Sequence, residues 1–127
     1  MKCLLDAHTV LWLSENAPQL SEKAKSAIFD PTNKKFVSIV SAWEIAIKIS
    51  VGKLKIDGGV AEFFRMVDEN GFIFLPLKKE HVEHIQTLPL HHRDPFDRML
   101  IAIAASEDMS LITADENIHL YDISWVW

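Results

Sequence analysis

Short apolar runs that alternate with segments of helical spacing constrain the fold of this 127-residue chain most strongly. Each run is uncharged and nearly continuous, which is typical of strands that are buried on both faces. Such strands occur in parallel sheets whose two faces are covered by helices, so the sequence predicts an α/β fold with a mostly parallel sheet. The expected strands are Cys3 to Leu5, Phe36 to Ile39, Phe72 to Leu75, Ser110 to Thr113 and a last one within Tyr121 to Trp127.

Helices are expected between these strands, and several of them carry recognisable end signals. Ser21 is a good N-cap, and Asp94 followed by Pro95 is the expected start of the most apolar helix. Asn70 and Gly71 are expected to end another helix. The predicted helical segments are Val10 to Leu13, a helix from Ser21 with Ala24, Ala27 and Ile28 facing inward, Ser41 to about Ser50, Val60 to Glu69 with Phe63, Phe64 and Val67 facing inward, Lys79 to Leu88, and a long helix from Pro95.

The composition is that of an ordinary globular domain, with 49% apolar and 24% charged residues. The single cysteine, Cys3, allows no intramolecular disulfide, which favours a reducing compartment. Asp6 interrupts the first apolar run too early for a signal peptide, and the longest apolar run, Met99 to Ala105, is too short to span a bilayer. We therefore expect one soluble, cytoplasmic domain over residues 1–127, without a membrane partner.

The net charge of −5 argues mildly against binding nucleic acid through bulk electrostatics. The distribution of charge matters more than the net charge. If five of the 18 acidic residues were gathered around metal ions, the remaining 13 would equal the 13 basic residues, and the rest of the surface would be nearly neutral. Lys48, Lys53 and Lys55 form a loose basic run that could contact a nucleic-acid backbone, although a solvated surface explains it equally well. A polyanionic substrate is therefore permitted by the charge but not demonstrated.

Carboxylates stand just past a strand or at a helix start in four places, namely Asp6, Glu44, the pair Asp94 and Asp97, and Asp115. In open parallel sheets, sites lie beyond the carboxyl ends of the strands. All four places are therefore expected at one edge of the sheet.

Each acid except the first also has a good structural explanation. Glu44 could form a capping box with Ser41, and Asp94 and Asp97 have the spacing of a similar capping motif. Asp115 could cap the short segment that follows it. An acid that ends a buried strand gains little from the local backbone, so the structural explanation is weakest for Asp6.

Together, however, clustered carboxylates would repel one another unless they were protonated or bridged by cations. Hard divalent ions such as Mg²⁺ or Mn²⁺ suit a site built only from carboxylates. No zinc-type Cys/His spacing and no Gly-rich phosphate loop is present. Metal ions held in this way can polarise a phosphate and activate water for an in-line displacement, so no side-chain nucleophile is required.

Histidines and arginines lie close to these acids in the sequence. His8, His91 and His92 could shuttle protons, although partly exposed packing is the more common role of such histidines. Arg93 and Arg98 flank the acid pair and could hold phosphate, but salt bridges to neighbouring acids explain them as well.

Four blocks of the chain together resemble the PIN domain family, and more narrowly the VapC-type ribonuclease toxins of prokaryotic type II toxin–antitoxin modules. The resemblance covers essentially the whole chain, and the four blocks in this order and spacing are specific, whereas any one alone is weak. The blocks are Leu4-Leu5-Asp6, Ser41-Ala42-Trp43-Glu44-Ile45, Asp94-Pro95-Phe96-Asp97-Arg98-Met99-Leu100-Ile101-Ala102 and Leu111-Ile112-Thr113-Ala114-Asp115.

The resemblance implies a metal-dependent endoribonuclease on a three-layer α/β/α sandwich. It implies that Asp6, Glu44, Asp97 and Asp115 are the catalytic acids, which coordinate Mg²⁺ or Mn²⁺ and position the attacking water. It also implies an RNA substrate, often transfer RNA, a small antitoxin as protein partner, and a homodimer.

Four other residues are expected around the acids. Thr9, Asp94, Arg98 and Thr113 are expected to support the four acids, and Asp94 is an extra acid typical of one subgroup. The sequence departs from the family pattern at Ala7, where many members carry Thr or Ser directly after the first acid. A hydroxyl contact to substrate or metal-bound water at that place is therefore not expected, and Thr9 follows further on.

The sequence leaves two other classes of function open. The first is a PIN-like domain that no longer cleaves and serves as an interaction module, against which the complete acid set counts. The second is a phosphatase-like or receiver-like fold with Asp6 as nucleophile. Such phosphatases carry a second Asp where this chain has His8, and receivers carry a late Lys, whereas no Lys follows Lys79. The RNA target, the number of metals and the roles of Trp125 and Trp127 are not determined by the sequence.

Overall fold

The computed structural model, which describes residues 1–127, contains one five-stranded sheet in the order β3-β2-β1-β4-β5. All four strand pairings are parallel, so the predicted α/β class is confirmed and the sheet is wholly rather than mostly parallel. β1 is central, and its Leu5 pairs in register with Val37 of β2 and with Ile112 of β4. The strands are β1 (Lys2–Leu5), β2 (Lys34–Ser38), β3 (Ile73–Leu75), β4 (Ser110–Ile112) and β5 (Trp125–Val126).

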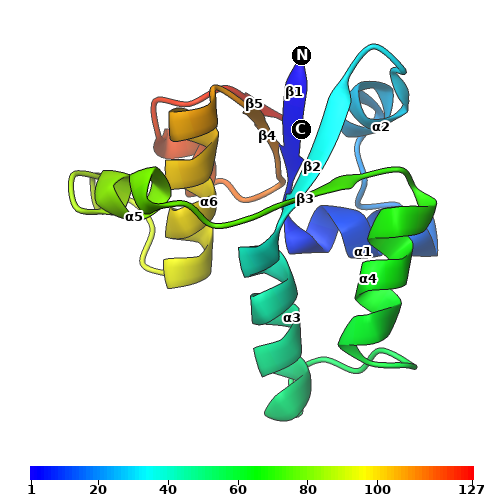
Figure 1. Cartoon of the computed structure of the whole chain (residues 1–127). Coiled ribbons are helices and arrows are strands. Elements are labelled where there is room, and N and C mark those ends of the chain that lie inside the picture. The colour runs from blue at the N-terminus through cyan, green and yellow to red at the C-terminus, as the bar shows by residue number, and fades with distance from the viewer.

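The chain has six α-helices, and five of them cover the two faces of the sheet, as expected for a three-layer α/β/α sandwich. α5 and α6 lie on one face, whereas α1, α2 and α4 lie on the other, and α3 projects from the end of β2 (Figure 1). No helix combines the length and the apolar character needed to cross a membrane. The helices are α1 (Ala7–Glu15), α2 (Glu22–Phe29), α3 (Ile39–Ser50), α4 (Val60–Glu69), α5 (Lys79–Ile85), α6 (Pro95–Glu107) and the 3-10 helix η1 (Ile118–Leu120).

The core consists of two apolar clusters, one on each face of the sheet, and β1 contributes to both. Cys3 and Leu5 belong to the cluster under α1, α2 and α4, whereas Leu4 belongs to the cluster under α6. All three side chains are fully buried. A strand that is covered on both faces needs apolar residues at every position, which explains the continuous run at the start of the sequence.

The start of α3 differs from the prediction. The helix begins at Ile39 because Ser38, at the end of β2, is its N-cap and accepts a 3.0 Å hydrogen bond from the Val40 amide. The expected strand therefore ends at Ser38, and the expected helix start at Ser41 is wrong. Ser41 lies inside the helix, where its hydroxyl is buried without a hydrogen-bond partner, so the capping box with Glu44 is also wrong.

Other boundaries shift by smaller amounts. α4 ends at Glu69 as predicted, and Gly71 lies in the left-handed region of backbone conformation. Of the two aromatic residues expected to face inward, only Phe63 is buried. Phe64 is 37% exposed and packs edge-on against Phe74. The helix predicted over Lys79 to Leu88 ends at Ile85. The predicted strand in the tail is limited to β5.

Candidate metal centre

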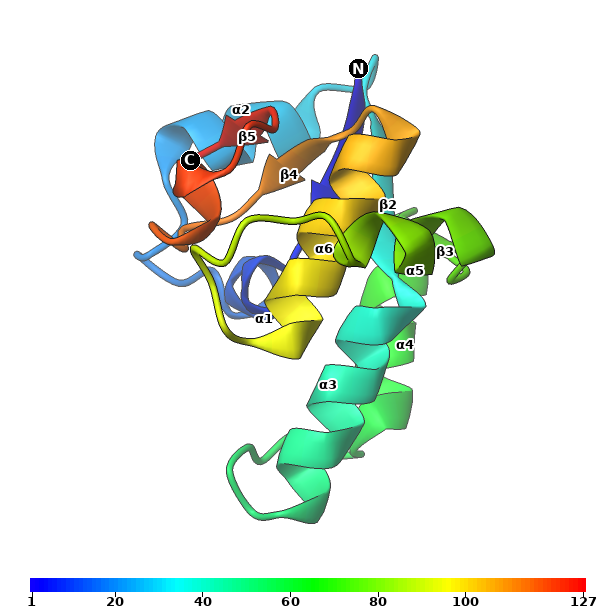
Figure 2. The same cartoon turned by 90° about the vertical axis from the view of Figure 1, so that its left-hand side faces the viewer.

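The carboxyl edge of the sheet gathers the acids that the sequence singled out. Asp6 follows β1 directly and is the N-cap of α1, and Asp97 lies in the first turn of α6. Asp115 follows β4, which pairs with β1, and Glu44 lies on α3, which follows β2. In Figure 2, α1, α3 and the start of α6 all lie below the sheet. The parallel topology therefore brings together acids from four separate parts of the chain.

Asp6 is held rigidly by its own helix. Its Oδ1 atom accepts hydrogen bonds from the Thr9 amide at 2.8 Å and from the Thr9 hydroxyl at 2.7 Å. The Thr9 hydroxyl also lies 3.0 Å from the Ile112 carbonyl oxygen of β4, so it ties α1 to the neighbouring strand. The Oδ2 atom of Asp6 has no hydrogen-bond partner and remains available for a ligand.

Asp94 and Asp97 have different roles at the start of α6. Asp94 is the N-cap, as predicted, and its Oδ1 atom accepts from the amides of Phe96 at 2.8 Å and Asp97 at 3.3 Å. Asp97 is not used for capping. Burial, followed by the charges of Asp94 and Glu44, raises the pKa of Asp97 to about 7, although His92 opposes the shift. Asp97 therefore resists ionisation in this crowded site unless a cation compensates its charge.

His92 joins the acids through its imidazole ring. Its Nε2 atom lies 2.8 Å from Oδ2 of Asp115 and 3.2 Å from Oδ2 of Asp97. Its Nδ1 atom accepts a 3.1 Å hydrogen bond from the Asp94 amide, so the neutral ring carries its proton on Nε2 and donates it to the carboxylates. Ligand atoms of His92, Asp97 and Asp115 all lie within 4.8 Å of one another.

Asp115 is kept ionised by the same contacts. Burial raises its pKa, but the hydrogen bond from His92 and those from the amides of Asn117 and Ile118 outweigh burial and bring the pKa below its ordinary value. Asp115 thus both binds the backbone before η1 and faces His92. The environments of Asp97 and Asp115 push the pKa values of two nearby carboxyls apart, which is common at functional sites.

Glu44 stands beside this group and has its own cation. Its side chain is 6% exposed, and its Oε2 atom lies 2.7 Å from Nζ of Lys48, one helical turn later. Although burial opposes the shift, the hydrogen bond and charge of Glu44, together with Asp94 and Asp97, raise the pKa of Lys48. The charge of Glu44 helps to raise the pKa of Asp97. The Glu44 carboxylate is nevertheless not part of the cluster formed by His92, Asp97 and Asp115.

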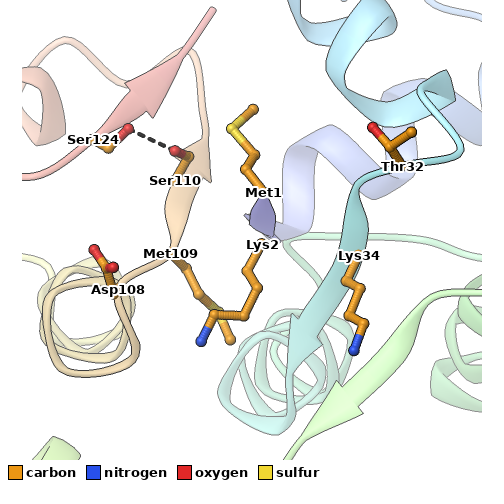
Figure 3. A pocket seen from close by; sticks show the side chains of 8 residues that line it. All are labelled: Met1, Lys2, Thr32, Lys34, Asp108, Met109, Ser110 and Ser124. Carbon is orange, nitrogen blue, oxygen red and sulfur yellow. Dashed lines mark hydrogen bonds between the residues drawn. The ribbon is translucent and has the colours of Figure 1, made fainter.

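Three of the acids line one cavity. Asp6, Asp97 and Asp115 border a hollow of about 210 Å³ together with Trp12 and other residues of α1 and the β4 end. A larger hollow of about 570 Å³ lies at the opposite, amino edge of the sheet. Figure 3 shows that this second hollow is lined by lysines, hydroxyl side chains, methionines and Asp108, and that Ser110 and Ser124 share a 2.6 Å hydrogen bond at one side of it. None of the four acids borders it, so size alone does not identify the site.

The residues expected to support the acids do so in different ways. Thr9 binds Asp6, and the hydroxyl of the fully buried Thr113 accepts a 3.2 Å hydrogen bond from the Asp115 amide. Arg98 forms no salt bridge with an acid, so the explanation of this residue by a salt bridge to a neighbouring acid is wrong. It donates instead to the carbonyl oxygens of Pro89 at 3.0 Å and His92 at 3.3 Å.

Tyr121, which sequence reasoning missed, completes the support of the loop that carries His92. Its hydroxyl accepts from the amides of His91 at 3.1 Å and His92 at 3.0 Å, and donates to the Pro89 carbonyl oxygen at 2.6 Å. No local pattern links Tyr121 to His92, because the contact is tertiary. The Lys48 pairing could have been predicted, since Glu44 and Lys48 have the i, i+4 spacing that favours an ion pair.

The donor set fits a hard divalent cation. Carboxylate oxygens are the ligands that Mg²⁺ and Mn²⁺ prefer, and a metal would relieve the repulsion that raises the pKa of Asp97. The unpartnered Oδ2 atom of Asp6 and the clustered oxygens of Asp97 and Asp115 are the first candidates for such a role.

Comparison with known proteins gives a family and a fold. The family model described as the PIN domain matches residues 3–124 of this chain. No curated protein matches it. A structure of VapBC2 from Rickettsia felis bound to a promoter DNA fragment is similar, with a TM-score of 0.74 at 11% identity over 98% of this chain and 97% of that chain.

Two further structures are similar over nearly their whole length. DNA-bound VapBC from Salmonella typhimurium has a TM-score of 0.72 at 14% identity, covering 98% of this chain and 96% of that chain. VapBC-1 from nontypeable Haemophilus influenzae has a TM-score of 0.66 at 19% identity with the same coverage of 98% and 96%. At these identities the likeness establishes the fold.

Proposed function

Because this chain belongs to the PIN domain family, we propose that it is a metal-dependent endoribonuclease and the toxin of a VapC-type toxin–antitoxin module. The observation that carries this proposal is the convergence of Asp6, Asp97 and Asp115 on one cavity at the carboxyl edge of the sheet. The raised pKa of Asp97 supports it, because a carboxyl that resists ionisation when empty gains most from a bound cation.

Mg²⁺ or Mn²⁺ would be held by Asp6, Asp97 and Asp115, with Glu44 at the margin of the site. When bound, such an ion polarises a phosphate oxygen and lowers the pKa of water, which is the chemistry that phosphodiester hydrolysis needs. Lys48 neutralises Glu44 in the metal-free protein through the 2.7 Å contact. It thereby limits the charge that the remaining acids must tolerate.

The other residues of the site orient these acids. Thr9 fixes one oxygen of Asp6 and leaves the other free, and Asp94 fixes the first turn of α6, on which Asp97 lies. His92, as an Nε2–H donor, holds Oδ2 of Asp115 and of Asp97. In this arrangement His92 holds a proton at Nε2 beside the acid cluster, where it could act as a general acid.

The proposed partners follow from the similar structures. The similar proteins include VapBC assemblies and one described as a toxin–antitoxin complex from Klebsiella pneumoniae, with a TM-score of 0.63. By analogy with these assemblies we propose an antitoxin as the protein partner of this chain. The resemblance to VapC-type toxins, rather than these structures, is the ground on which we also propose a homodimeric state, a cytoplasmic location and an RNA substrate, with transfer RNA as the first candidate.

The test is cleavage of total RNA by the purified protein with Mg²⁺, with Mn²⁺ and with chelator. Asp97→Asn removes a proposed ligand at nearly constant volume, and Asp68→Asn makes the same chemical change at an exposed position on α4. We expect cleavage by the wild type and by Asp68→Asn that requires the metal, and none by Asp97→Asn. Equal cleavage by all three proteins, or cleavage in chelator, would contradict the proposal.

A further inference from the structure

An aromatic wall stands beside the acids in the same cavity. Trp12, on α1, borders the hollow that Asp6, Asp97 and Asp115 also line, and it is only half-buried. Its ring centroid lies 5.6 Å from that of His8 and 5.7 Å from that of Trp127, with interplanar angles of 35° and 54°. Trp12 is therefore held in place by rings from α1 and from the C-terminal tail while part of it faces the acid cavity.

A second hollow adjoins the first on the other side of His8. It has a volume of about 170 Å³ and is lined by Leu11, Leu54, Lys48, Lys53 and neighbouring residues, and His8 borders both hollows. The Lys48 ammonium is occupied by Glu44. The exposed Lys53 ammonium has no hydrogen-bond or ion-pair partner. An aromatic side chain thus borders the acid cavity itself, and a free cation borders the hollow that adjoins this cavity at His8.

This arrangement suits a nucleic-acid strand whose bases are unpaired. The protein carries a net charge of −5, so phosphate contacts alone supply little affinity. Stacking on an aromatic ring contributes without charge, because every base has a π-face. A base inside a duplex is already stacked and cannot present that face to a side chain, whereas bases of loops and single strands can.

Building on the nuclease function proposed above, we propose that Trp12 stacks on an unpaired nucleobase next to the scissile phosphate and that Lys53 contacts a flanking phosphate. Trp12 and Lys53 set where a strand lies across the acids, and the acids themselves carry out no base recognition.

The experiment measures binding of labelled RNA octamers by fluorescence anisotropy in the Asp97→Asn background with Mg²⁺. Trp12→Leu removes the aromatic face, and Trp43→Leu is the matched control. Trp43 is 60% exposed on α3 and packs edge-on against Phe96, away from both hollows. We expect Trp12→Leu to weaken binding of single-stranded octamers by about fivefold or more, and Trp43→Leu to leave it unchanged. RNA duplex is expected to bind weakly to every variant.

An abasic scan separates stacking from a general loss of structure. An octamer that lacks its base at the stacked position should bind the parent protein as weakly as intact RNA binds Trp12→Leu, and combining the two changes should cause no further loss. The proposal would be overturned if, at every abasic position, the loss of affinity added to the loss caused by Trp12→Leu. It would also be overturned if Trp12→Leu bound intact RNA as tightly as the parent protein does.

Lys53 is tested in the same assay through the salt dependence of binding. Lys53→Met should weaken binding and reduce the salt slope by about one, whereas Lys79→Met, at an exposed position on α5, should change neither. An unchanged slope would remove Lys53 from the site. Because the protein lacks Asp97 throughout, these results do not depend on cleavage, and failure of the nuclease proposal remains distinguishable from failure of this one.

Discussion

Replacing Asp97 by Asn should stabilise the metal-free protein, although it removes a proposed ligand. The pKa of Asp97 is raised from 3.8 to about 7, chiefly by burial and then by the charges of Asp94 and Glu44. At about 1.36 kcal/mol per pKa unit, the folded state pays roughly 4 kcal/mol for the ionised carboxylate at high pH. Asn has similar volume and no charge, so this cost disappears.

The sign of the effect fixes its dependence on pH. Because the folded pKa lies above the unfolded one, the contribution of Asp97 to stability is fully present below about pH 4 and is lost as the pH rises through about 7. Between pH 5 and pH 8 the metal-free wild type should therefore lose about 2–3 kcal/mol relative to Asp97→Asn. Other titrating groups are common to both proteins and largely cancel in the difference.

The assay is urea unfolding in chelator, followed by tryptophan fluorescence, at pH 5, 6, 7 and 8. The Asp68→Asn variant should track the wild type at every pH, because the Asp68 carboxylate is exposed and forms no side-chain hydrogen bond or salt bridge. A stability difference between wild type and Asp97→Asn that stays constant with pH would refute the reasoning. So would a variant that is less stable than the wild type at pH 8.

Three further variants test the groups around the acids. Thr9→Val should lower the free energy of unfolding by about 1–3 kcal/mol in urea titrations, because the buried carboxylate of Asp6 loses its 2.7 Å hydroxyl donor; unaltered unfolding would contradict this. Tyr121→Phe should cost about 1–3 kcal/mol and speed amide exchange at His91 and His92, whose amides lose their acceptor; unchanged exchange would show that the Tyr121 hydroxyl does not hold the loop. Lys48→Met should destabilise the metal-free protein by about 1–3 kcal/mol, since Glu44 stays buried without its cation, and saturating Mg²⁺ should reduce the loss; a loss independent of Mg²⁺ would separate Glu44 from the metal.

The sequence predicted those parts of the fold that depend on local rules. Asp94 could be predicted as the N-cap of α6 because the capping carboxylate, the proline after it and the amides that donate to it all lie within a few residues of one another. The acids at the ends of β1 and β4 could be placed at one edge because parallel strands share their carboxyl ends. These inferences require no knowledge of how distant segments pack.

The remaining features depend on tertiary contacts that a pattern does not contain. Ser38 and Ser41 are both acceptable N-caps, and the end of β2 at Ser38 decides between them. Phe64 has the spacing of an inward residue but lies at the edge of the α4 face. His92 reaches the acids because Tyr121 and Arg98 hold its loop. Tyr121 is distant from His92 in sequence, and Arg98 donates to the His92 carbonyl oxygen rather than to an acid, so neither contact could be predicted from a local pattern.

The most direct test of the central claim compares metal binding with RNA cleavage in one titration. Mn²⁺ binding is measured by electron paramagnetic resonance and cleavage by gel, for the wild type, Asp68→Asn and single amide variants of Asp6, Asp97 and Asp115. The account predicts that half-maximal cleavage and half-saturation occur at the same Mn²⁺ concentration, and that each cavity variant weakens both whereas Asp68→Asn changes neither. Mn²⁺ binding that is indifferent to the three acids, or RNA cleavage without bound metal, would contradict it.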